Sequence, residues 1–151
     1  MTAVISLRAY TGTNAATESA ALDDVELISE DAVTGDPVAP GTVSFERWLR
    51  LKIESAPAVG VANFWVMNTG DLPDGVSLLF GVTDTPATPV DTVSVIATKT
   101  LVSGQRYIFD ANTYIDSGDK TRWLVIQEVV SDDSPDGAIP EQALRLGWAE
   151  R

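Results

Sequence analysis

The chain of 151 residues contains no histidine and no cysteine. Without histidine, the Ser-His-Asp and Cys-His systems that activate nucleophiles are excluded. Without cysteine, disulfide scaffolds and iron–sulfur clusters are excluded, and structural zinc loses both of its usual ligand types. Because most familiar catalytic chemistry depends on these residues, we expect a protein that is not an enzyme and that binds no cofactor.

Basic residues are scarce: ten Lys and Arg stand against 22 Asp and Glu, a formal net charge of -12. Proteins that bind phosphate backbones need the opposite balance, so we expect no nucleic-acid partner. Long apolar runs are missing too, since stretches such as 76–82 are far below the roughly 18 residues that span a bilayer. Ser6 and Arg8 interrupt the apolar start that an export signal would need. The sequence predicts no membrane partner.

Apolar material is sufficient for one domain, because 44% of the residues are hydrophobic. The clearest pattern lies in 43–54, where Leu49, Leu51 and Ile53 share one face and charged residues share the other, as in a half-buried strand. Further strands are predicted at 76–82, 92–97, 106–110, 121–130 and 143–148, with turn clusters between them. Roughly seven to nine short strands without an amphipathic helix predict an all-β fold, a single antiparallel β-sandwich or jelly-roll-like domain.

The first 42 residues differ from the rest in composition. Residues 11–42 are rich in Thr, Ala, Gly, Asp and Pro, and 31–41 alone hold two prolines and two glycines. A short strand is predicted around Val25 and Leu27. We therefore divide the chain into an N-terminal arm or long loop with short strands, 1–42, and a β-sandwich domain, 43–151. An extended arm that reaches neighbouring subunits and an ordinary long loop are both open at this stage.

The acidic residues form no recognisable catalytic or metal-binding motif. Most lie in predicted turns, where Asp side chains accept hydrogen bonds from nearby backbone amides. The segment 110–116 places oxygen-bearing side chains at alternate positions, but it lacks the glycine and glutamate of an EF-hand loop. We predict no catalytic residue and no metal site, while a loose calcium site in an acidic loop stays open as an alternative.

Aromatic residues are the remaining candidates, because they anchor protein contacts or stack on sugars. Trp48 and Trp123 fall in well-patterned strands and are expected in the core or on a face of the sheet. Trp65 follows Phe64, so the two side chains must point to opposite faces of a strand, and one of them lies outside the core of a two-layer sandwich. The candidate protein-contact residues are Trp65, Leu72, Tyr114 and Trp148.

Six short motifs follow one another between residues 43 and 130: SFERWLRLKI at 44–53, VANFW at 61–65, DLPDGV at 71–76, LFGVT at 79–83, Thr88-Pro89, and WLVIQ at 123–127. This order of elements resembles small structural proteins of tailed-bacteriophage virions. The resemblance implies a β-sandwich that coats the capsid as a decoration (cement) protein, with a neck or tail position as the alternative. It carries no active site over to this chain.

The resemblance also implies a partner and a location. The partner would be the major capsid protein or another virion protein, in a virion assembled in the host cytoplasm. A homo-oligomer such as a trimer and a monomer that orders on a lattice both fit the composition. Strong acidity would keep the free chain soluble and repel it from packaged DNA, while basic patches on the shell would steer it into place.

A second class of function stays open beside this one. A carbohydrate-binding or adhesin-like β-sandwich module is favoured if Trp65, Tyr114 and Trp148 lie exposed and in line, because a sugar-binding face needs two or three such rings.

Overall fold

The computed structural model describes residues 3–22, 38, 41–69, 72, 75–131 and 144–150. Its strands are β1 (Val4–Thr11), β2 (Thr17–Glu18), β3 (Arg47–Ser55), β4 (Val61–Asn68), β5 (Val76–Thr83), β6 (Lys99–Thr100), β7 (Tyr107–Asp110), β8 (Trp123–Val130) and β9 (Leu144–Glu150). One 3₁₀ turn, η1 (Thr13–Ala15), follows β1. The described part of the chain contains no α-helix, so the predicted all-β class is confirmed.

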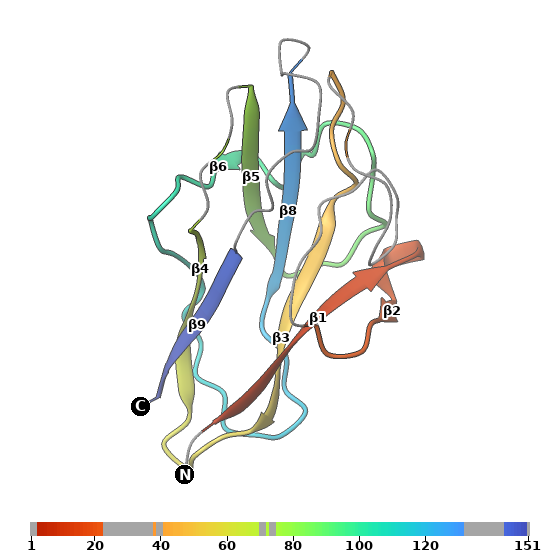
Figure 1. Cartoon of the computed structure of the whole chain (residues 1–151). Coiled ribbons are helices and arrows are strands. Elements are labelled where there is room, and N and C mark those ends of the chain that lie inside the picture. The colour runs from red at the N-terminus through yellow and green to blue at the C-terminus, as the bar shows by residue number, and fades with distance from the viewer. Residues whose placement is uncertain are drawn as a thin grey trace.

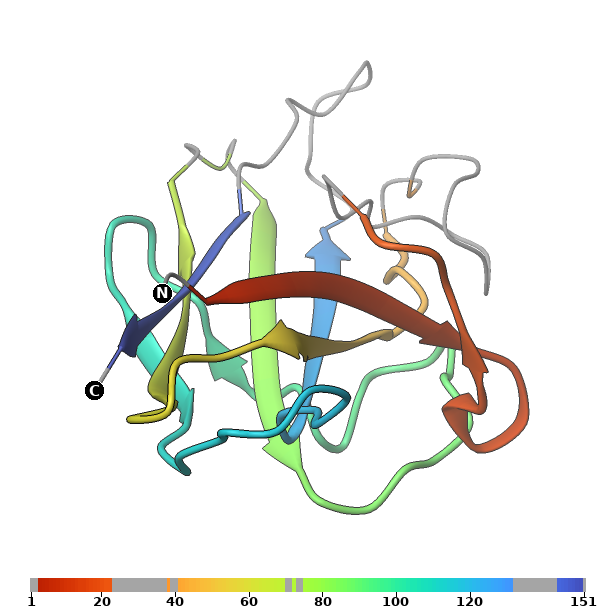
Figure 2. The same ribbon diagram turned by 90° about the horizontal axis from the view of Figure 1, so that it is seen from below.

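Two sheets pack face to face (Figures 1 and 2). The larger sheet has six strands in the order β2-β1-β3-β8-β5-β6, and the smaller has three in the order β7-β4-β9. Every strand pair in both sheets is antiparallel. The predicted antiparallel β-sandwich is therefore confirmed.

The main core lies between the two sheets. On β3, Leu49, Leu51 and Ile53 are buried, whereas Arg50 and Lys52 between them point to the other face, as the period of two predicts. The core residues from the other strands are Ala9 of β1, Val61, Phe64 and Val66 of β4, Leu78 and Phe80 of β5, Phe109 of β7, and Leu124 and Ile126 of β8. Contributions from both sheets make this a single hydrophobic core.

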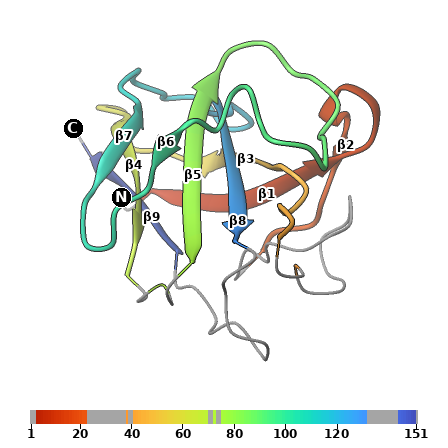
Figure 3. The ribbon, with the colours of Figure 1, turned by 90° about the horizontal axis from the view of Figure 1, so that it is seen from above.

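The opposite face of the six-stranded sheet is also covered. The connection between β5 and β6, residues 84–98, swings toward β2 before it returns to β6 (Figure 3). Beneath it lies a second apolar cluster made of Tyr10, Ala15, Trp48, Ala97, Trp123 and Val125. This cover explains why β8 is buried along nearly its whole length rather than on alternate residues.

The strand predicted at 92–97 is wrong, because this segment is irregular. Its backbone groups bond to side chains instead of to a neighbouring strand. The Ser94 N–H donates to Gln127 Oε1 at 2.9 Å, and Gln127 Nε2 donates to Thr92 O at 2.7 Å. Ser94 Oγ accepts hydrogen bonds from the N–H groups of Ile96 and Ala97 and donates to the buried Glu46 carboxylate. The alternation of valines with polar residues in this segment therefore does not reflect strand pairing. Side-chain hydrogen bonds hold the segment in place instead, and we call this set of contacts the Glu46–Ser94–Gln127 clamp.

Residues at the start of the predicted arm belong to the large sheet. β1 pairs with β3 from Val4 to Tyr10, and β2 pairs with the end of β1. The N–H of Leu22 donates to Leu7 O, so the chain still follows the sheet at that point. The strand expected around Val25 and Leu27 lies outside the described residues.

Gly81 tests how tightly the 84–98 connection is held. A Cβ at this position would overlap the backbone carbonyl of Ile96, and the clamp leaves that backbone little room to move. We expect Gly81→Ala to lower the free energy of unfolding by about 2–3 kcal/mol, as overpacking does in a closed core. Denaturant unfolding measures the change.

Gly118→Ala is the matched control. Gly118 has open space around its Cα, so alanine costs only the left-handed backbone conformation, about 1 kcal/mol. Equal losses in the two variants would contradict a tight contact between Gly81 and the connection.

Candidate functional site

The described residues offer no grouping of three or more Asp or Glu side chains that could hold a metal ion. Within the same residues, no helix has the length and apolar character needed to cross a membrane. The remaining candidates in the described part of the chain are single buried titratable groups and exposed surfaces.

Glu128 is the buried carboxyl whose acidity is most altered. It lies on the inner face of β8 between Ile126 and Val130, opposite Leu78 of β5. Burial raises the pKa of Glu128 to about 7. That value suits a general acid or base. No described residue forms an ion pair or a hydrogen bond with the carboxyl group, so burial alone accounts for the shift. Because the charged form of Glu128 is buried without a described partner, it destabilises the folded chain.

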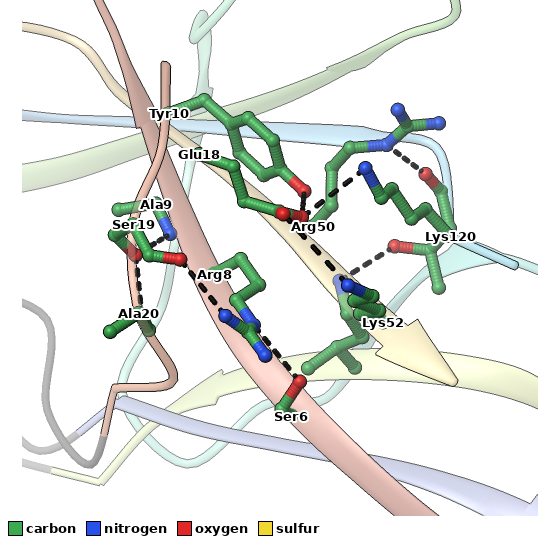
Figure 4. A network of polar contacts seen from close by, with 12 residues as sticks. Ser6, Arg8, Ala9, Tyr10, Glu18, Ser19, Ala20, Arg50, Lys52 and Lys120 are labelled. Carbon is green, nitrogen blue, oxygen red and sulfur yellow. Dashed lines mark hydrogen bonds and ion pairs between the residues drawn. The ribbon is translucent and has the colours of Figure 1, made fainter. Parts of the chain in front are cut away.

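Most Lys and Arg side chains on the outer face of the six-stranded sheet form hydrogen bonds or ion pairs within the molecule (Figure 4). Glu18 of β2 accepts a 2.6 Å hydrogen bond from the Tyr10 hydroxyl and lies 3.2 Å from Lys120 and 3.9 Å from Lys52. The hydrogen bond from Tyr10 is the main cause that lowers the pKa of Glu18, and burial raises the pKa of Tyr10. This network fastens β2 to β3 and to the turn before β8.

Two arginines near this network, Arg8 and Arg50, also form contacts within the molecule. Arg8 donates to Glu54, with 3.2 Å between Nη2 and Oε1. Arg50 donates through Nε to Thr121 O at 2.6 Å, and its guanidinium lies 4.5 Å from the centroid of the Trp123 ring. These cations serve the fold, and they leave little unpaired charge for a ligand.

The outer face of the three-stranded sheet is different, and a bulge in β4 creates it. Asn63 has a positive φ of 56°, and the pairing of β4 with β9 shifts its register there. The extra residue moves the alternation by one place, so Phe64 and Val66 enter the core while Trp65 and Met67 point outward. The prediction that Phe64 and Trp65 face opposite ways is confirmed.

Two rows of side chains cross this outer face. Trp65 pairs with Ile108 of β7 on one side and with Gly147 of β9 on the other. In the next row Met67 pairs with Arg145, and the register continued by one residue brings Arg106 opposite Met67. We call the surface formed by Trp65, Met67, Arg106, Ile108, Arg145 and Gly147 the Trp65 face.

Contacts around Trp65 hold its ring flat against the sheet. A Cβ on Gly147 would overlap the indole, so the ring lies directly over that glycine. The Arg106 guanidinium lies 4.1 Å from the ring centroid, a cation–π contact. Trp65 and Met67 are partly exposed, while Ile108 is 61% exposed. The indole is therefore both rigid and reachable.

The charge of the Trp65 face is opposite to that of the whole chain. Arg106 and Arg145 are exposed, and no described carboxylate lies within ion-pair distance of either. None of the six residues of the face is acidic, although the chain carries a net charge of -12. The Trp65 face is thus a small positively charged and aromatic surface on a protein of net negative charge.

The other three candidate contact residues lie elsewhere. Leu72, Tyr114 and Trp148 are partly buried and pack against the main core. The Tyr114 hydroxyl donates to Asp110 at 2.6 Å, its ring centroid is 5.6 Å from that of Phe64, and burial raises its pKa to about 12. The structure therefore brings none of these three onto the Trp65 face.

Five residues of the Trp65 face were not among the sequence candidates: Met67, Arg106, Ile108, Arg145 and Gly147. The available signal was local alternation, since Ile108 lies between Tyr107 and Phe109 and Arg145 lies between two apolar residues. Alternation shows that these side chains point away from the core, but only the order β7-β4-β9 brings them together.

Comparisons with protein-family models, with curated proteins and with solved structures find no significant match to this chain. The class that the fold defines is an all-β sandwich of two antiparallel sheets.

Glu128 makes stability depend on pH. Because its folded-state pKa of about 7 lies above the ordinary value of 4.5, its protonated form favours folding below pH 4.5, and that contribution is lost as the pH rises through 7. Allowing for partial solvent screening, we expect Glu128→Gln to raise the free energy of unfolding by about 2 kcal/mol at pH 8 and to change it little at pH 4. Denaturant unfolding across this pH range measures the difference.

Glu54→Gln is the control with the opposite sign. Hydrogen bonds from Ser6 and then Arg8 lower the pKa of Glu54, so its contribution to folding is present above pH 4.5 and lost in acid. Glu54→Gln should therefore destabilise at neutral pH. A loss of stability at pH 8 in Glu128→Gln would contradict the burial argument.

Proposed function

We propose that the chain is a non-enzymatic structural protein of a tailed-phage virion, a capsid decoration protein that binds and stabilises the shell of the major capsid protein. The observation that supports this proposal is the Trp65 face. Its tryptophan, methionine and arginines are the residue types enriched in the central part of protein interfaces. The sequence resemblance supplies the kind of particle, and the Trp65 face supplies a surface with which to bind it.

A rigid sheet is a suitable base for such a contact. Trp65 is held by strand pairing on both sides of β4, and Ile108 by the pairing of β7 with β4. Little backbone freedom is therefore lost on binding. A buried tryptophan contributes 150–250 Å², roughly, of contact area.

The charge of the Trp65 face indicates what kind of surface the partner presents. The net acidity alone predicts basic patches on the shell, but Arg106 and Arg145 give the Trp65 face a positive charge. The complementary patch on the capsid would therefore be apolar at its centre with carboxylates at its rim. The acidic remainder of the chain would keep neighbouring copies soluble before assembly.

Sugar binding has less support. The carbohydrate-binding alternative needs Trp65, Tyr114 and Trp148 exposed in one line, yet Trp65 lies on the outer face and the other two pack against the core. We therefore do not propose it as a second function.

Copy number on the particle tests the assignment. Quantitative mass spectrometry of purified virions of the phage that encodes the chain should find a number comparable to that of the major capsid protein or of its hexamers. A number far below either would place the protein at the neck or tail instead. Absence from the particle would overturn the proposal.

Variants of the Trp65 face test the surface. In a co-sedimentation assay with shells that lack the chain, we expect Trp65→Ala to weaken binding by about thirtyfold, as loss of a central anchor does, and Arg106→Glu to weaken it by about tenfold. Arg106→Glu leaves the indole over Gly147 and so separates binding from folding. The control Val95→Ala, on the 84–98 connection and 89% exposed, should bind as the unchanged chain does. Equal binding by all three variants would exclude this face as the contact.

A further inference from the structure

The four sheet edges of the sandwich are unequal in length. Three of them end in short strands: β2 and β6 have two residues each, and β7 has four. β2 and β6 cover only part of the long strands beside them, β1 and β5. Backbone hydrogen bonds from Ser19 and Leu22 to β1, and from Leu101 to β5, extend this cover. The fourth edge is β9, with seven residues, and no described strand pairs with its outer side. Short edge strands are a common means of preventing unwanted strand pairing, and β9 departs from that pattern.

The inward side chains of β9 leave apolar surface for a further strand to cover. Leu144, Leu146 and Trp148 pack against the main core, yet all three stay partly exposed. The sheet that carries them has three strands, whereas the sheet opposite has six. A strand added beside β9 would cover more of these side chains with apolar residues of its own.

The outward side chains of β9 favour a neighbouring strand that carries negative charge. Arg145, Gly147 and Ala149 alternate with the inward residues, and Arg145 has no described carboxylate within ion-pair distance. Gly147 adds no side chain of its own, and the Trp65 indole lies over it. A neighbouring strand would therefore meet one arginine and the edge of an aromatic ring, and acidic residues fit this side best.

We propose that β9 is the acceptor edge for an extended segment in which apolar and acidic residues alternate. The apolar residues of that segment would lie beside Leu144, Leu146 and Trp148, and the acidic residues would lie beside Arg145. Main-chain hydrogen bonds supply affinity in this binding mode, and the alternate side chains supply specificity. The source of the segment rests on the proposed function: it would be a strand or arm of the capsid partner. A second copy of this chain paired through its own β9 fits less well, because the outward residues of that strand are Arg145, Gly147 and Ala149 and offer no carboxylate to Arg145.

A defined peptide tests the edge without any virion component. The probe is a blocked heptapeptide, Thr-Glu-Val-Glu-Val-Glu-Thr, titrated into the full isotope-labelled chain at about 0.15 M salt, where charge repulsion beyond about 8 Å is screened. We expect backbone amide resonances of 144–150 to shift and their hydrogen exchange to slow. Perturbation centred on β2, β6 or β7, no binding at millimolar peptide, or self-association of the chain in its place would overturn the proposal.

Charge reversal provides the specificity control. Arg145→Glu should weaken binding of the acidic peptide by about tenfold and favour a peptide with lysines in place of the glutamates. Lys99→Glu makes the same change of charge on β6, another edge strand, and should alter binding by less than about twofold. Equal effects of the two variants would mean that binding follows net charge and not the β9 edge.

The two proposals can fail separately. If the peptide does not bind but the chain is abundant on virions, the β9 proposal is overturned while the Trp65 face stays the candidate contact. If the peptide binds but virions lack the chain, the edge is an acceptor for a different partner and the virion function is overturned.

Discussion

Burial of β8 on both faces is the constraint on which the rest of the structure depends. A strand in this position needs a cover on each side, and one small sheet can supply only one of them. The other cover is the 84–98 connection, an irregular segment whose backbone polar groups need partners when they are buried. Gln127 of β8 and Glu46 before β3 provide these partners, so the Glu46–Ser94–Gln127 clamp satisfies the connection and fixes it over Trp48 and Val125.

The basic residues of the two sheets differ in whether they form ion pairs. On the six-stranded sheet, Lys52, Lys120 and Arg8 are paired with carboxylates, and they join β2 and the turn before β8 to the body of the sheet. Pairs this exposed add little stability each, but together they fix the geometry of that edge. On the three-stranded sheet, Arg106 and Arg145 have no such partners among the described residues. Two basic residues that form no ion pair within the described part of the chain, Arg106 and Arg145, therefore lie on the same face as Trp65.

Local pattern predicted the strands well where one face is buried and the other is polar. Leu49, Leu51 and Ile53 follow that rule, and so do Leu78 and Phe80 of β5. The rule was wrong at 92–97. Ser94 lies between valines there, but its backbone N–H donates to the side chain of Gln127, more than 30 residues away, and not to a neighbouring strand. The Trp65 face could be predicted only in part. Its tryptophan was recognisable from the neighbouring Phe64, but the arginines join it through strand order and through the bulge at Asn63, and a single sequence contains neither in readable form.

The bulge at Asn63 links the face to the edge. Without the extra residue, Trp65 would fall on the same side as Val61, inside the core, and Gly147 would have no ring above it. With it, the indole projects outward over β9, so the aromatic anchor and the seven-residue edge form one continuous surface. A partner that paired with β9 would place its outward side chains against Trp65 and Arg145 in the same step. Strand pairing would then fix the orientation of the partner, and the aromatic and charged contacts would decide which partner is accepted.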